Sequence, residues 1–109
     1  MPRFSEYVDA VYNYLENHMP FEVGSVVALK AAKILKESKL PQNPASLFQI
    51  NYILNLLAMA LDADIVEYSR GRLYVFRRSD LAELVKLGRD GFWLLVNYLD
   101  KARLLIPQG

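Results

Sequence analysis

The sequence predicts one α+β domain that is mainly helical. Three features support this prediction: apolar residues recur at helical spacing along most of the chain, Asn43-Pro44 is a typical helix start, and a hairpin pattern surrounds Gly71. The chain has 109 residues, of which 53% are hydrophobic, and this suits a single hydrophobic core. We therefore expect one domain over residues 1–109.

Two helices and a short strand are expected before residue 40. The first helix is predicted from apolar residues at helical spacing, and Pro20 ends it near residue 18. Its apolar positions are Phe4, Val8, Val11 and Leu15. The segment Phe21–Val23 is expected to be a minimal strand. A second helix is expected from about residue 24 to Ser38. Its buried residues are expected to be Val27, Ala31, Ile34 and Leu35.

A third helix is predicted from residue 44 to about residue 60. Asn43 can accept hydrogen bonds from amides of the first turn, and Pro44 stands where the helix needs no amide donor. The apolar residues of this helix form one stripe. We expect that stripe to be buried: Leu47, Ile50, Leu54, Leu57 and Leu61.

A hairpin is predicted over residues 65–76. Loops at 70–71 or at 69–72 give the same pairing, which is Tyr68 with Leu73 and Val66 with Val75. This apolar face is expected to lie on the core. Tyr74 and Phe76, on the other face, could stack on a single-stranded nucleic acid, although packing beneath the last helices is favoured.

Two more helices are expected after the hairpin. The first opens with Ser79-Asp80 and stops near Gly88, and the second starts at Asp90-Gly91. The apolar surface of the second is wider than one stripe, so it either closes the domain's own core or forms a symmetric homodimer. We favour the dimer. The interface residues would be Phe92, Trp93, Leu95, Val96 and Leu99.

The composition gives no support for an enzyme. Without cysteine the chain has no disulfide framework, thiolate zinc site or cysteine nucleophile. Its one histidine, His18, is expected at the end of the first helix, and no glycine-rich phosphate loop is present. We expect no metal and no cofactor. The chain also lacks a long uncharged apolar stretch and a secretory leader pattern, so we expect a soluble, cytoplasmic protein without a membrane partner.

The net charge is only +1, but the charge is unevenly distributed. Residues 70–78 contain four arginines and no acidic residue, whereas residues 40–69 contain three acidic residues and no basic one. Four more cations lie before this acidic stretch, at Lys30, Lys33, Lys36 and Lys39. Local fields, more than the total charge, therefore decide which partners the protein can attract.

The predicted order over residues 4–87 is helix, short strand, helix, turn, helix, two-stranded wing and helix. This order resembles the winged helix-turn-helix domains of archaeal and bacterial DNA-binding proteins. Phe21–Val23 would be the first strand, Val26–Ser38 and Pro44–Ala60 the helix pair, and Ile65–Phe76 the wing. Residues 4–78 would then form the winged-helix core, and residues 79–109 a carboxy-terminal helical extension. The resemblance implies that the second helix of the pair enters the major groove and that the wing contacts the backbone or the minor groove.

We therefore expect a small DNA-binding protein, a transcriptional regulator, that binds duplex DNA through the helix at 44–60 and the wing at 65–78. The expected contacts are Arg70, Arg72, Arg77, Arg78, Lys30, Lys33, Lys36, Lys39, Ser46, Gln49, Asn51, Tyr52 and Asn55. Since the helix at 44–60 lacks a basic residue, a second reading stays open. In that reading the chain is a winged-helix protein–protein interaction module in a transcription, replication or RNA-processing assembly. A third reading is a chromatin-like protein that binds DNA without sequence preference.

Overall fold

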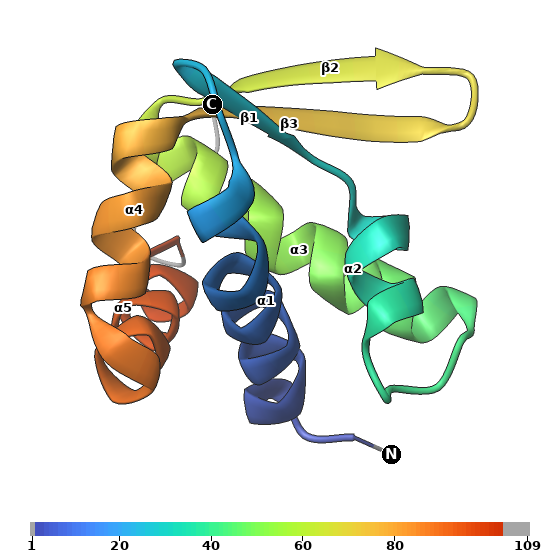
Figure 1. The fold of residues 1–109 in the computed structure, drawn as a ribbon. Coiled ribbons are helices and arrows are strands. Elements are labelled where there is room, and N and C mark those ends of the chain that lie inside the picture. The colour runs from blue at the N-terminus through green and yellow to red at the C-terminus, as the bar shows by residue number, and fades with distance from the viewer. Residues whose placement is uncertain (1, 104–109) are drawn as a thin grey trace.

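Residues 2–103 are described by the computed structural model (Figure 1). A group of helices lies beneath one face of a three-stranded antiparallel sheet, so the predicted α+β, mainly helical class is confirmed. The order of elements is compatible with a winged helix. The elements are α1 (Phe4–His18), η1 (Met19–Phe21), β1 (Val26–Leu29), α2 (Ala31–Glu37), α3 (Pro44–Leu61), β2 (Asp64–Tyr68), β3 (Gly71–Arg77), α4 (Arg78–Lys86) and α5 (Gly88–Ala102).

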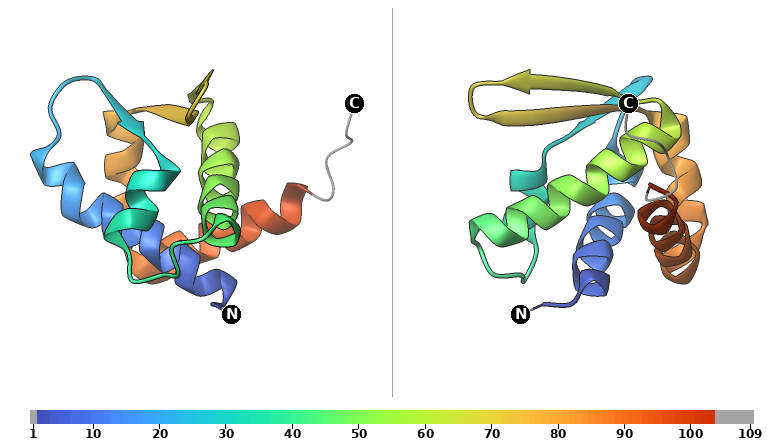
Figure 2. Two further views of the ribbon diagram at one scale, coloured as in Figure 1. Left: turned by 90° about the vertical axis from the view of Figure 1, so that its right-hand side faces the viewer. Right: turned by 180° about the vertical axis from the view of Figure 1, so that it is seen from behind.

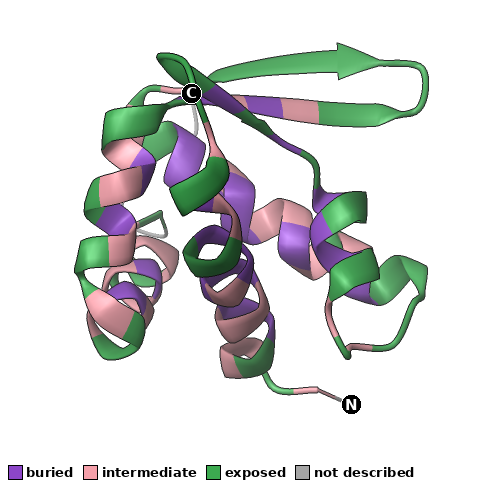
Figure 3. Ribbon diagram, viewed as in Figure 1, coloured by how far each residue is buried: buried purple, intermediate pink, exposed green. Residues whose placement is uncertain are grey.

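The sheet has the strand order β1-β3-β2, with β3 in the middle. Alternate residues of β1 are buried, and each lies beside a buried aromatic residue of β3: Val27 beside Phe76 and Leu29 beside Tyr74. This face of the sheet packs on the helices, with α3 and α4 both in contact with β3. Figure 3 shows buried segments on α1, on α3 and in the middle of the sheet, while the hairpin tip is exposed.

The predicted position of the first strand is wrong. Residues 19–21 form the short helix η1, and the strand is Val26–Leu29, which the sequence had assigned to the second helix. Helix α2 therefore begins only at Ala31. Residues 26–29 form a strand because they pair with β3. A segment of four residues has only a weak preference of its own for strand or helix, and its hydrogen-bond partners lie far along the chain. The expected burial of Val27 is correct, although Val27 lies in a strand.

The predicted register of the hairpin is also wrong. The loop is Ser69-Arg70, so Tyr68 pairs with Gly71 and Val66 with Leu73. This register differs by two residues from the prediction and keeps the same residues on each face. The face expected on the core, however, is turned outward: Val66 is 48% exposed and Tyr68 is 41% exposed.

The opposite face of the hairpin lies on the core because β1 extends it. Val27 and Leu29 join the two aromatic residues of β3 there, and the sequence had not placed a strand at these positions. Tyr74 and Phe76 are both fully buried. They pack inside the protein and offer no stacking platform to a nucleic acid.

Helix α3 runs through the centre of the molecule and packs against α1, α2, α5 and β3. Its predicted start is confirmed, since Asn43 Oδ1 accepts a hydrogen bond from the amide of Ser46 at 2.8 Å. By length and composition α3 could also cross a membrane. Here it serves as the core helix of a globular fold, which is consistent with a soluble protein. Its fully buried residues include Ile50, Ile53, Leu54 and Leu57.

Helices α4 and α5 complete the same hydrophobic core. Helix α4 begins at Arg78, and Ser79 makes no capping hydrogen bond there. Helix α5 begins at Gly88, two residues before the predicted start. Phe92 and Val96 are fully buried against the chain's own core, with the Phe92 ring 5.5 Å from the ring of Tyr12. These two residues are therefore not available to a second copy, contrary to the predicted dimer interface.

The other residues of that predicted interface also face inward. Trp93, Leu95 and Leu99 are partly buried and pack against the core. Trp93 lies 6.1 Å from Phe4, measured between ring centroids. One side of α5 thus completes the domain, because α1 and α3 offer it an apolar surface within the same chain.

Candidate nucleic-acid interface

Helix α2 and the hairpin formed by β2 and β3 project toward the same side of the molecule. In Figure 2, left, both elements face the viewer, with the hairpin above α3 and α2 beside α3. Lys30 connects them, since it occupies the N-cap position of α2 and its Nζ lies 5.3 Å from the centroid of the Tyr68 ring. Gly71, which pairs with Tyr68, has no side chain to obstruct this approach.

The cations of α2, of the turn after it and of the hairpin loop differ from most others in the described residues because they carry no intramolecular ion pair. Within residues 2–103, carboxylates neutralise five other cations, of which Arg72 and Arg77 lie on β3: Arg72, Arg77, Lys86, Arg89 and Arg103. Over the same residues, no carboxylate forms an ion pair with a cation of α2, of the turn after it or of the hairpin loop. These free cations are Lys30, Lys33, Lys36, Lys39 and Arg70.

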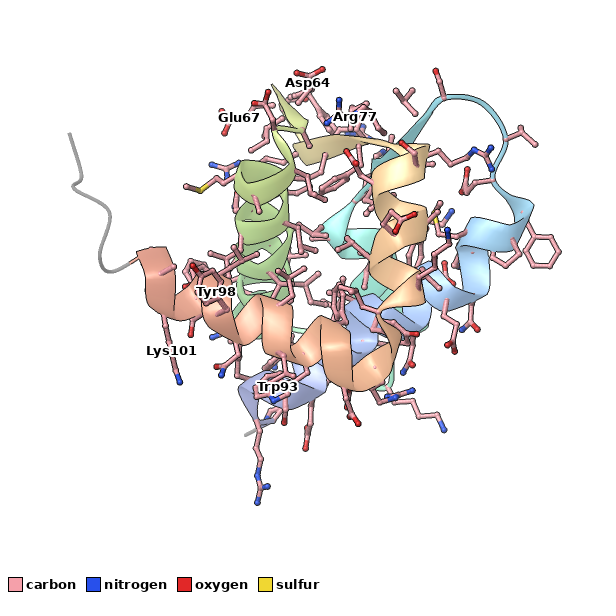
Figure 4. The ribbon with its side chains drawn as sticks, turned by 90° about the vertical axis from the view of Figure 1, so that its left-hand side faces the viewer. Asp64, Glu67, Arg77, Trp93, Tyr98 and Lys101 are labelled. Atoms are coloured by element: carbon pink, nitrogen blue, oxygen red, sulfur yellow. The ribbon has the colours of Figure 1, made fainter. Side chains whose placement is uncertain are left out.

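Two of the four arginines expected to bind DNA are held by acidic neighbours. Arg72 Nε lies 2.8 Å from Oε1 of Glu67, its partner on β2, and Arg77 Nε lies 2.9 Å from Oδ2 of Asp80. Asp64, at the start of β2, also lies near Arg77 (Figure 4), so the base of the hairpin is of mixed charge. Arg78 forms no ion pair within the described residues, but it lies at this base, where α4 begins.

The polar residues predicted on α3 do not form one exposed reading surface. Ser46 is buried, with its Oγ 3.3 Å from the Tyr7 hydroxyl, so it is not available to DNA. Tyr52 is partly buried and donates its hydroxyl hydrogen to Asp100. Gln49 is partly exposed, and within the described residues its side chain makes no hydrogen bond.

Asn51 and Asn55 are partly exposed, but both amides hold the fold together. Asn51 Oδ1 accepts a hydrogen bond from the Tyr74 hydroxyl at 2.9 Å, and Asn55 Oδ1 accepts one from Arg72 Nη1 at 3.3 Å. A base edge that used these oxygens would have to compete with existing donors. The two asparagines therefore hold β3 against α3, and their side-chain oxygens are already engaged and not free to bind a base.

A groove of about 380 Å³ lies between α3 and the hairpin. It is lined by Phe48, Asn51, Tyr52, Asn55, Gly71 and Arg72. The sequence analysis did not select Phe48, whose side chain is 69% exposed. Its position one residue after Leu47, outside the apolar stripe of α3, was the available signal. An exposed aromatic ring can contact the methyl group of thymine or an apolar partner.

The hydrogen bond between Tyr74 and Asn51 depends on a protonated phenol. Burial raises the pKa of Tyr74 above its ordinary value of 10.0, so the hydroxyl remains a donor at neutral pH. Burial likewise raises the pKa of Tyr12, Tyr14 and Tyr52. All four phenols ionise less readily in the folded chain than in the unfolded chain.

We therefore predict a loss of stability in alkali. A raised pKa in the folded state contributes stability that is complete below pH 10 and is lost as pH rises through the folded-state pKa. The midpoint of urea denaturation should therefore fall between pH 9 and about pH 11.5. Tyr74→Phe should lessen this fall. A midpoint that does not change with pH would contradict the prediction.

Comparison of the chain with models of protein families, with curated proteins and with solved structures gave no match. The functional assignment is therefore built on the fold, the distribution of charge and the contacts described above.

Proposed function

We propose that the protein is a winged-helix protein that binds duplex DNA and acts as a transcriptional regulator in the cytoplasm. One observation carries the proposal: α2 and the hairpin project toward the same side of the molecule (Figure 2), and within residues 2–103 the cations of α2, the following turn and the hairpin loop form no ion pair, while most other cations do. Unneutralised lysines and arginines attract phosphates and release counterions from DNA when they bind.

In this proposal, different residues contact the DNA backbone and the DNA bases. Lys30, Lys36, Lys39 and Arg70 would contact phosphates and fix the position of the protein on the duplex. Lys33 is left out because it lies beside the Tyr14 hydroxyl of α1. Helix α3 would face the major groove through Gln49 and Phe48, with Asn51 and Asn55 holding the hairpin in place. Because few free polar groups remain on α3, we expect modest selectivity between DNA sequences.

The second candidate is a winged-helix protein–protein interaction module. It is favoured by the outer face of the sheet, where Val26, Val66 and Tyr68 are exposed beside the partly buried Leu73 and Val75. An apolar sheet face of this kind is typical of a surface that binds protein. Affinity for DNA and its dependence on salt distinguish the two candidates.

We predict that Arg70→Ala lowers the salt dependence of DNA binding. Each phosphate contact contributes roughly 0.9 to the slope of log affinity against log salt, so loss of Arg70 should reduce the slope by about 0.9. Arg72→Ala should have a smaller effect because Glu67 and Asn55 already engage this guanidinium. Fluorescence anisotropy with a labelled duplex between 50 and 200 mM salt measures the slope.

Arg3→Ala is the matched control, since Arg3 is exposed and precedes α1 at the end of the molecule away from the hairpin (Figure 1). This variant should retain the slope of the parent protein. Equal slopes for Arg70→Ala and the parent would remove the hairpin loop from the DNA interface and would favour the protein-interaction module.

A further inference from the structure

The outward side of α5 carries an apolar stripe that no element of the described chain covers. Leu94 is 65% exposed and Tyr98 is 68% exposed, and Leu87, at the N-cap of α5, is about half exposed. With Gly91 these residues follow one another at intervals of four, three and four positions. That spacing is the heptad pattern by which two helices pack together.

This stripe lies opposite the side of α5 that completes the core. Phe92 and Val96 are fully buried on the inner side, whereas Figure 4 shows Tyr98 and Lys101 at the outer surface of the helix. The inner side of α5 is therefore covered by the core of the same chain. An amphipathic helix does not need apolar residues on its solvent side, so the outer stripe points to a partner.

We propose that α5 packs antiparallel against α5 of a second copy of the chain. If the two-fold axis passes near Leu94, Gly91 of each copy lies level with Tyr98 of the other. A Cβ at position 91 would lie only 3.0 Å from Leu87 Cβ, so glycine at this position lets Leu87 pack closely against α5. In the pair, the Tyr98 ring would lie over Gly91 and Leu87 of the other copy, and the two Leu94 side chains would meet near the axis.

The charges at the ends of the stripe select this partner and this orientation. Asp90 lies on the stripe's edge in the first turn of α5, and Lys101 lies in its last turn. An antiparallel pair brings each aspartate within reach of the lysine of the other copy, whereas a parallel pair brings like charges together. The stripe therefore complements itself in charge. This inference does not depend on DNA binding.

Sedimentation velocity over a range of protein concentrations tests the dimer. The parent chain should associate reversibly into dimers. Leu94→Asp should weaken this association by more than about 100-fold, because two leucines lose their burial and two carboxylates face each other. Tyr98→Ser should weaken it as well. Phe48→Ser is the matched control, since Phe48 is equally exposed on α3 and should leave the dimer unchanged. Circular dichroism checks that each variant is folded.

A charge exchange tests the orientation. Asp90→Lys or Lys101→Asp alone should weaken the dimer roughly 3- to 10-fold, and the double variant should restore it. A parent chain that stays monomeric up to about 1 mM, at which a weak complex would form, would overturn the proposal. So would a dimer that tolerates Leu94→Asp, and a double variant weaker than both single variants would rule out the antiparallel arrangement.

Discussion

Replacing Phe92 with alanine is expected to lower the free energy of unfolding by about 3–5 kcal/mol. The ring is fully buried and packs beside Tyr12, so its removal leaves a cavity that neighbouring side chains cannot easily fill. Urea denaturation followed by circular dichroism measures the change. Phe48→Ala removes the same side chain from an exposed helical position and should change the stability by less than about 1 kcal/mol.

The Phe92 variant also separates the two roles that this residue could have. If Phe92 lay between subunits, its replacement would change stability by an amount that depends on protein concentration. Its place in the core of one chain predicts a loss that does not depend on concentration. Equal effects of Phe92→Ala and Phe48→Ala would contradict the buried position.

The second large effect is expected from removing three free cations together. A variant with Lys36, Lys39 and Arg70 replaced by alanine should bind duplex DNA about 10²- to 10³-fold more weakly at 0.1 M salt. The estimate follows because each phosphate contact contributes roughly 0.9 log units at this salt concentration. All three residues are exposed, so stability should change little.

A variant with Arg3, Lys86 and Arg89 replaced by alanine is the control. It removes the same net charge, but its residues lie on α1, α4 and α5 or beside them. It should retain most of the affinity of the parent protein. If both variants lost affinity equally, total charge and not a localised surface would determine binding, and the proposed interface would be wrong.

Local sequence signals predicted the elements that depend on neighbours in the chain. Asn43 and Pro44 fix the start of α3 through contacts within one turn, so this start was visible in the sequence. Strand β1 depends instead on hydrogen bonds with β3, about fifty residues later. Four residues with apolar side chains next to a helical pattern look like part of that helix, and β1 was therefore missed.

The side of α5 that faces the core could not be read from the sequence. Apolar residues lie on both sides of this helix: Phe92 and Val96 on one side, and Leu94 and Tyr98 on the other. Periodicity identifies a buried side only when the opposite side is polar. The packing of α1 and α3 against α5 decides which residues are buried.

The candidate interface was predicted in part. The exposed position of Arg70 followed from the hairpin, whose existence was correctly predicted. The ion pair between Arg72 and Glu67 could not be predicted from the hairpin pattern. It depends on the strand register, which Ser69-Arg70 and Gly71 set together. Gly71 has a φ of +142°, which a glycine adopts easily, and it stands just after the loop instead of within it. A shift of two residues thus changed which arginines remain free.

The most direct test of the proposed function is the affinity of the parent protein for a duplex of mixed sequence, measured as salt is raised from 50 to 200 mM. Four phosphate contacts, from Lys30, Lys36, Lys39 and Arg70, predict a slope of about −3.6 in log affinity against log salt. Such a slope, reduced to roughly −0.9 in the triple alanine variant, would establish the surface formed by α2 and the hairpin loop as the DNA interface. Absence of binding at 50 mM salt, or an affinity that does not change with salt, would contradict it.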